Sequence, residues 1–268
     1  MPDLFLLFIL VLLGLVFGSF ISALSYRAIA GLSIFKGRSI CPRCKKTISW
    51  KDNVPVLSFF LLKGKSRCCK KLISIRYPLI EFFTMLVFFV IGLMFLNSSA
   101  SEGPIFIWRN LIGFWALPYL LFVSVFLITI FVTDFEHKLI LDRFVFIPFV
   151  FTFLLIMFFN PDYSYANLFL SFVSASFFLL IHLLTKGKGM GLGDVKLALL
   201  LSLVLGWPYT LIWLFLSFVI GAVVGVILIF VKRAKFGQHI PFGPFLILAY
   251  FLVLFWGDKL LFLFRLSL

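Results

Sequence analysis

The stretch MPDLFLLFILVLLGLVFGSF (residues 1–20) decides the fold class, because it is an apolar run of the length that crosses a bilayer. It lacks the basic start and the small-residue cleavage site of a removed signal peptide, so we expect a retained membrane helix. The whole chain shares this character: 63% of its 268 residues are hydrophobic, 13% are charged, and the mean hydropathy is +1.19. A soluble core could not bury so much apolar surface.

Apolar runs without a ten-residue alternation favour helices over a barrel. We therefore predict an all-α, polytopic helical membrane protein with about eight transmembrane helices and a small cytoplasmic loop domain that contains the cysteines. The expected spans are residues 4–30, 78–96, 105–133, 144–159, 164–185, 195–207, 209–231 and 242–257. The fourth and sixth are short, and Trp207-Pro208 is the break between the sixth and the seventh.

Basic residues give the orientation. Half of the 24 Lys and Arg lie in one segment, as Lys36, Arg38, Arg43, Lys45, Lys46, Lys51, Lys63, Lys65, Arg67, Lys70, Lys71 and Arg76. Others lie in the connections 134–143, 186–194 and 232–241, whereas the connections 97–104, 160–163 and 207–208 hold none. Because cytoplasmic loops carry the excess of Lys and Arg, both termini are expected outside. The net charge of +14 then reflects topology and anionic lipid, and we expect no nucleic acid partner.

Three regions follow from this pattern: a first transmembrane helix (1–30), a cytoplasmic loop domain (31–77) and a membrane-embedded domain (78–268). The loop is too short for an ordinary domain core without a staple such as a metal.

Two acids are expected on the same cytoplasmic face, since Asp134 closes the third span and Asp194 opens the sixth. Acids are costly in so apolar a bundle and are functional candidates. Asp194 also suits a helix N-cap after its glycines, and Asp134 also suits a solvated helix end. Spacing alone leaves these alternatives open.

A carboxylate pair has a specific chemistry. Two carboxylates that share a site do not both ionise easily, so one keeps a proton while the other activates a water for attack on a peptide carbonyl. Such proteolysis needs no metal or cofactor. Gly191 and Gly193, with Gly189, would let a substrate backbone approach Asp194. The rival interpretation is a proton- or cation-coupled transporter that uses Asp134 and Asp194, which predicts midplane acids and inverted repeats.

Several motifs resemble one family. GLGDVKL (191–197) resembles the GxGD element of intramembrane aspartyl proteases, and VTDFEHKLILD (132–142) resembles the first aspartate motif of the type IV prepilin peptidases. GSFISALSYR (18–27), CPRC (41–44), the segment 49–81 and IPFGPFL (240–246) continue the similarity in the family's order.

The resemblance implies an aspartyl endopeptidase of the bacterial cytoplasmic (inner) membrane, with its active site facing the cytoplasm. It would remove the basic leader from type IV prepilins or type II secretion pseudopilins, with Asp134 and Asp194 as the catalytic pair. Lys196 matches a lysine of the motif, and the hypothesis is that it lowers a nearby carboxylate pKa or binds a substrate carbonyl; the alternative is that its ammonium extends to the membrane interface. Leu141 stands where the family commonly has proline.

All four cysteines, Cys41, Cys44, Cys68 and Cys69, lie in the cytoplasmic loop, where disulfides are disfavoured. Cys-x-x-Cys followed by a second pair indicates a structural zinc site, and the alternative is a loop with reduced thiols. By resemblance, Ser66 occupies the place of the third cysteine and Cys68 is displaced by two positions. Adjacent cysteines are expected to fit one tetrahedron poorly.

The resemblance also implies N-methylation of the new N-terminus, with S-adenosylmethionine as the methyl donor. Gly64 and Lys65, together with Asn53 and Pro55, match the region associated with that activity. The chain has no GxGxxG element after a strand, so a cofactor site would differ from a Rossmann crevice. Glu81, Glu136 and Asp142 are the hypothesised contacts for the basic leader.

Overall fold

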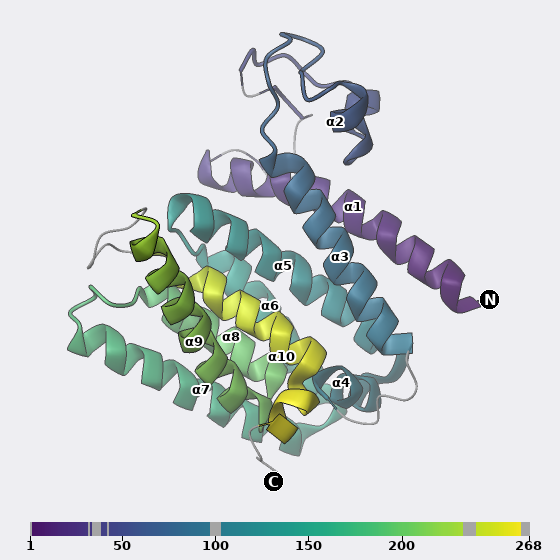
Figure 1. Ribbon diagram of the computed structural model, residues 1–268. Helices are drawn as coiled ribbons and strands as arrows, with labels where there is room; N and C mark the ends of the chain where they lie inside the picture. Colours follow the sequence, from purple (N-terminus) through teal and green to yellow (C-terminus); the bar gives the residue numbers. More distant parts are fainter. Residues whose placement is uncertain are drawn as a thin grey trace. The chain divides into compact units, whose positions relative to one another are not determined.

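The computed structural model describes residues 2–31, 33, 39–41, 43–96, 103–232 and 240–263. The basic residues Lys36, Arg38, Arg233 and Lys235 of the topology prediction lie outside this part. Within it the chain is helical, and the backbone pairs only in two isolated β-bridges, Ile40 with Thr47 and Lys65 with Leu72 (Figure 1).

Seven helical segments in the described part are long and apolar enough to cross a membrane, which confirms the all-α polytopic prediction. They are Asp3–Ile29, Arg76–Leu96, Pro104–His137, Asp142–Phe159, Pro161–Leu184, Tyr209–Phe230 and Gly243–Leu263. The eighth expected span is α8 (Leu192–Leu205), whose 14 residues at about 1.5 Å each fall short of a bilayer core of about 30 Å. The structure therefore gives seven candidate spans where the sequence suggested about eight.

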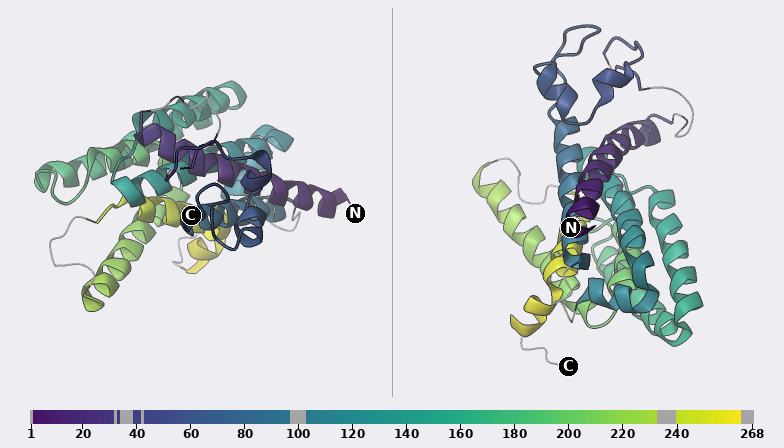
Figure 2. Two further views of the ribbon diagram at one scale, coloured as in Figure 1. Left: turned by 90° about the horizontal axis from the view of Figure 1, so that it is seen from above. Right: turned by 90° about the vertical axis from the view of Figure 1, so that its right-hand side faces the viewer.

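The chain divides into two compact units, Met1–Leu96 and Asn97–Leu268. In the first unit, α1 (Pro2–Ile29) packs along α3 (Arg76–Leu96) (Figures 1 and 2). A Cβ on Gly14 would lie 2.5 Å from the Cα of Met85, and one on Gly18 would lie 2.5 Å from the Cα of Glu81. The two glycines, four residues apart on α1, thus let the helix backbones touch, as small residues do in membrane helix pairs.

The segment between α1 and α3 carries two short helices, η1 (Trp50–Asn53) and α2 (Leu57–Leu61). Its two β-bridges close two tight turns, each with a lysine in the left-handed region, Lys45 at φ 59° and Lys70 at φ 54°. These turns carry the four cysteines.

The second unit is a helical bundle arranged around α8. It contains α4 (Pro104–Ile112), η2 (Gly113–Trp115), α5 (Ala116–His137), α6 (Asp142–Phe159), α7 (Pro161–Leu184), α9 (Tyr209–Phe230) and α10 (Gly243–Leu263). Helices α6, α7, α9 and α10 all contact α8, whose residues from Leu197 to Leu205 are almost entirely buried (Figure 1). Protein rather than lipid therefore surrounds this short helix.

The course of the chain brings the end of α5 to the beginning of α8. Helix α5 ends at His137, and its C-cap residue Lys138 takes a left-handed conformation (φ 55°) and donates its N–H to the Asp134 carbonyl oxygen at 2.9 Å. Helices α6 and α7 run out and back, joined at Asn160, whose side chain accepts the Tyr163 N–H at 3.1 Å as a helix cap. Two long helices return the chain to its starting end, so the expected meeting of Asp134 and Asp194 has a simple topological cause.

Candidate active site

Asp134 and Asp194 are buried carboxylates, each with 5% of its surface exposed. Asp134 lies in the last turn of α5 and Asp194 is the third residue of α8. The Asp194 Oδ2 accepts the Gly191 N–H at 3.1 Å, and the Asp194 N–H donates to the Gly191 carbonyl oxygen at 3.2 Å. Asp194 therefore helps to cap α8, as the sequence suggested, but it lies in the first turn of the helix and not at the N-cap position itself. The hydrogen bond from Gly191 holds its carboxylate in place.

The two carboxylates are near enough to interact. Asp194 precedes the bulk of α8 and lies outside the seven candidate spans. Burial, reinforced by the negative charge of Asp134, raises the pKa of Asp194 to about 7. The pair thus tends to hold one proton at neutral pH, which is the state required for one group to act as acid while the other acts as base.

Two glycines and one isoleucine shape the space around the pair. A Cβ on Gly243, at the start of α10, would lie 2.5 Å from Oδ2 of Asp134 and 3.1 Å from Cδ1 of Ile140. A Cβ on Gly193 would lie 2.9 Å from Cβ of Ile140. Ile140 is therefore in close contact with both glycine backbones, and neither glycine can be replaced without displacing a neighbour.

Polar contacts order the loop that precedes α8. The His182 ring Nδ1 lies 2.7 Å from the Met190 carbonyl oxygen, and the Gly189 N–H donates to the Thr185 hydroxyl at 3.1 Å. A Cβ on Gly189 would lie 2.9 Å from Cγ2 of Thr185. This glycine is thus required by packing within the loop.

Lys196 lies two residues after Asp194, and its ammonium contacts Asp142 rather than the pair. Its Nζ lies 2.7 Å from Oδ1 of Asp142, the first residue of α6. Glu81, in the first unit, accepts the Val56 N–H at 2.7 Å. Glu136 has its Oε2 3.8 Å from Nε2 of His137. The three hypothesised leader contacts therefore lie in three different environments.

The four cysteines form a cluster in the first unit. All four Sγ atoms lie within 4.8 Å of one another, with Cys41 4.0 Å from Cys69 and Cys44 3.0 Å from Cys68. Four thiolates around a zinc ion at about 2.3 Å would lie about 3.8 Å apart. The donor set therefore fits zinc, and the adjacent Cys68 and Cys69 both reach the cluster.

Two turns of the same form hold the cluster. Cys41 donates its N–H to the Lys46 carbonyl oxygen and accepts the Lys45 N–H, and Ser66 makes the same two bonds with Lys71 and Lys70. Ser66 thus takes the place in the second turn that Cys41 takes in the first. Cys68 supplies the fourth sulfur that Ser66 lacks. Its Sγ lies 3.0 Å from the Ser66 Oγ and belongs to the cluster together with that of the adjacent Cys69.

Hydrogen bonds within the cluster split the thiol pKa values. The backbone N–H of Cys44 lowers the pKa of Cys41 to about 6, and the contact with the Cys68 thiol raises the pKa of Cys44 to about 11. The Cys41 thiolate is thus favoured beside a protonated Cys44. A dication would favour all four thiolates.

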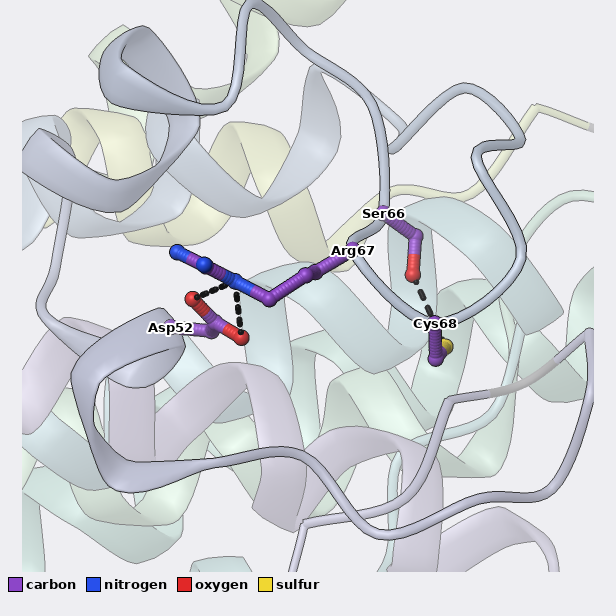
Figure 3. A network of polar contacts seen from close by, with 4 residues as sticks. All are labelled: Asp52, Ser66, Arg67 and Cys68. Atoms are coloured by element: carbon purple, nitrogen blue, oxygen red, sulfur yellow. Dashed lines mark hydrogen bonds and ion pairs between the residues drawn. The ribbon is translucent and has the colours of Figure 1, made fainter.

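A cavity of about 990 Å³ lies in the same unit. Its lining includes Tyr26, Arg27, Asp52, Phe59 and Glu81. Asp52 is held by Arg67, whose Nε donates to both carboxylate oxygens at 2.9 and 3.1 Å (Figure 3). The size lies within the range of small-molecule sites.

The methylation-region residues Gly64 and Lys65 support the loop beside this cavity. Gly64 has a positive φ of 68°, donates its N–H to the Phe59 carbonyl oxygen at 2.9 Å and accepts the Ile73 N–H at 2.8 Å. Among the described residues, the neighbours Leu62 and Ser66 line the cavity and Gly64 and Lys65 do not.

Sequence reasoning assigned no role to Gly243 or Ile140. Gly243 lies within the quoted motif IPFGPFL, and Ile140 lies between the two acids of VTDFEHKLILD. Gly243 and Ile140 contact Asp134 and Gly193 across elements that are distant in the chain. The only sequence signal for these two residues was that each lies within one of the motifs that carry the family resemblance.

Comparisons with known proteins agree with this architecture. Residues 12–95 match the Bacterial Peptidase A24 N-terminal domain, and residues 121–226 match the Type IV leader peptidase family. No solved structure matches the chain.

Several relatives carry the name prepilin leader peptidase/N-methyltransferase, and two of them illustrate the similarity. The protein of Aeromonas salmonicida (strain A449) is 34% identical over 231 residues, which cover 83% of this chain and 72% of the relative. The protein of Bacillus subtilis (strain 168) is 32% identical over 259 residues, which cover 96% of each chain. This multi-pass membrane protein therefore belongs to the prepilin leader peptidase/N-methyltransferase family of enzymes.

Proposed function

We propose that this enzyme removes the basic leader from type IV prepilins or pseudopilins at the cytoplasmic face of the bacterial inner membrane, and that Asp134 and Asp194 are its catalytic residues. The observation that carries the proposal is the burial of these two interacting carboxylates at the meeting point of α5 and α8. Burying an acid in an apolar bundle costs free energy, so two buried acids that interact indicate a function.

The chemistry follows from one shared proton. The ionised carboxylate takes a proton from a water molecule, whose oxygen attacks the scissile carbonyl carbon. The protonated carboxyl group stabilises the developing oxyanion, and a proton then passes to the leaving amine as the carbon–nitrogen bond breaks. The two acids titrate as a pair, so the roles of acid and base belong to the dyad rather than to one residue.

The proposal extends to methylation of the amine freed by cleavage. S-adenosylmethionine would supply the methyl group from its sulfonium, and the cavity of the first unit has the size and the charged residues for such a ligand. In this proposal residues 1–30 form the first membrane helix and residues 78–268 form the peptidase domain. Residues 31–77, which include Gly64 and Lys65, form the loop that carries out methylation. Zinc held by Cys41, Cys44, Cys68 and Cys69 would be structural.

Family membership disfavours the rival transporter function. In the proposal, the partners are prepilin-like substrates and membrane lipids, with no role for nucleic acid. The apolar segment of the substrate would lie among lipid-exposed helices, which places the scissile bond near the membrane surface. Burial of the carboxylates then requires a local opening before the substrate enters.

The test is cleavage of a prepilin by purified protein in lipid, with mass spectrometry of the new N-terminus. Asp134→Asn and Asp194→Asn should each abolish cleavage while circular dichroism and thermal melting show a folded chain. Asp162→Asn, which removes an exposed acid at the start of α7, is the matched control and should cut normally. Normal cleavage by either dyad variant would refute the assignment.

A further inference from the structure

Glu81 is a buried acid that the proteolytic mechanism does not use. It lies in the second turn of α3 with 7% of its surface exposed, and it lines the cavity of the first unit. The Val56 N–H donates to its Oε2 at 2.7 Å. Its backbone is fixed as well, because a Cβ on Gly18 of α1 would lie 2.5 Å from the Glu81 Cα. The carboxylate is therefore held in one place at the cavity wall.

Glu81 makes no ion pair within the part of the chain that the structure describes, although Arg27, Arg43, Arg67 and Lys71 also line the cavity. A buried carboxylate without a cationic partner is costly, and functional sites are where such costs persist. The arrangement is suited to a ligand that brings its own positive charge into the cavity.

The other acid in the cavity wall is already engaged. Asp52 accepts two hydrogen bonds from the Arg67 Nε, at 2.9 and 3.1 Å, from the loop that carries the second cysteine turn (Figure 3). Among the described lining residues, Glu81 is thus the acid that can receive a cationic group. A peptide amino terminus, an ammonium at the start of its reaction, is such a group.

We propose that Glu81 binds the newly freed amino terminus of the substrate and acts as the base for its methylation. This inference rests on the methyl-transfer half of the proposed function. The ammonium gives one proton to the Glu81 carboxylate, which leaves a neutral amine with a free electron pair. That nitrogen bonds to the methyl carbon of the sulfonium donor as the carbon–sulfur bond breaks, and the electron pair of that bond stays on sulfur. The product is a methylated ammonium and a neutral thioether, and Glu81 releases its proton to solvent.

Glu81→Gln keeps the size and the hydrogen bond to Val56 while removing the base. The substrate for the assay is a pilin peptide that has already been cleaved, so methylation is measured without proteolysis. We expect the methylation rate at pH 7 to fall roughly 5- to 10-fold, because only about a tenth of the amino termini are neutral at that pH without a base. An amino terminus has a pKa of about 7.7–8.0, so the residual rate of the variant should rise about tenfold per pH unit below that value as solvent deprotonates the amine.

Two further readouts distinguish a base from a structural residue. Binding of S-adenosylhomocysteine, measured by calorimetry, should stay within threefold of the wild type. Prepilin cleavage should keep its kcat, since the dyad lies in the other unit, and a rise in KM alone would report the hypothesised contact of Glu81 with the leader. Glu81→Asp, which retains the carboxylate, should keep more methylation than Glu81→Gln and guards against misfolding of the first variant. Asp162→Asn is the control for the loss of one acid.

The possible failures are distinct. In the first case the wild type cleaves and methylates its substrate, and Glu81→Gln methylates at the same rate. This result would overturn the role of Glu81 and leave the proposed function standing. A loss of S-adenosylhomocysteine binding of tenfold or more in a folded Glu81→Gln protein would also overturn it, because Glu81 would then hold the donor. Absence of methyl transfer by the wild type would overturn this inference together with the methylation half of the proposed function, while cleavage would still test the dyad.

Discussion

Lys196 on α8 and Asp142 at the start of α6 form an ion pair, with Nζ 2.7 Å from Oδ1. The two residues are 54 positions apart in the chain, and each is close in sequence to the dyad. Asp194, a member of the dyad, lies two residues before Lys196, and Ile140, which lies beside the dyad, is two residues before Asp142. The ion pair therefore ties the beginning of α8 to the segment that contacts Gly193 and Gly243.

The first prediction concerns that pair. Its side chains are 36% and 60% exposed, so its loss should change stability by less than about 1 kcal/mol. We expect Lys196→Met and Asp142→Asn each to lower kcat for cleavage roughly 3- to 10-fold, because the position of Asp194 is loosened. Lys196→Met should leave KM nearly unchanged, whereas a rise in KM for Asp142→Asn would report its hypothesised contact with the leader. The exchange Lys196→Asp with Asp142→Lys should recover part of kcat. Recovery would fail if Lys196 instead contacts the substrate directly.

A second prediction uses two glycines. Gly243→Ala would place a methyl group against the Asp134 carboxylate, 2.5 Å from Oδ2, whereas a Cβ on Gly225 of α9 would meet nothing within 4 Å. We expect Gly243→Ala to lower kcat/KM for cleavage by roughly 10- to 100-fold through displacement of Asp134. Gly225→Ala should leave cleavage unchanged. Equal activity of the two variants would show that the Gly243 contact does not matter.

The pH dependence of cleavage follows from Asp194. Burial and the charge of Asp134 raise its pKa to about 7, so the group is protonated below this pH and loses its proton above it. Cleavage needs one proton on the dyad, and kcat/KM should therefore fall as the pH rises through about 7. A rate profile from pH 5 to 9 on a fixed prepilin checks this expectation. A profile that stays level to pH 9 would contradict it.

The stability of the folded chain should depend on the same group and fall in the same direction of pH. The folded pKa of Asp194 lies above the unfolded value, so its contribution to folding is greatest at low pH and is lost as the pH rises towards about 7. We expect Asp194→Asn to melt at a higher temperature than the wild type at pH 8, and the difference to shrink at pH 5. Melting in one detergent at both pH values measures it. A variant less stable than the wild type at pH 8 would mean that the Gly191 hydrogen bond outweighs the charge.

The cysteine cluster allows an exchange experiment. The purified protein should contain about one zinc per chain, and Cys68→Ser should lose most of it. Ser66 occupies the position in the second turn that Cys41 occupies in the first, so adding Ser66→Cys to Cys68→Ser should restore zinc binding. Elemental analysis after dialysis against a weak chelator gives the content. If Cys68→Ser keeps its zinc, Cys68 is not a ligand.

The sequence alone determined the helical membrane class, because apolar runs near twenty residues long admit few other structures. It also determined which acids and cysteines to examine, since both are rare in this chain and stand in short motifs. These properties are local: they depend on composition and spacing within one segment.

Tertiary structure decided the rest. Four features depend on residues that are far apart in the chain. Helix α8 is short and enclosed by four other helices, and Lys196 contacts Asp142. Gly243 lies against Asp134, and Cys68 takes the place of Ser66 in the sulfur cluster. Hydropathy measures how apolar a segment is but not what surrounds it, so it could not separate a helix buried in protein from one buried in lipid. Contacts between distant elements are fixed by packing, and packing is a property of the folded chain as a whole.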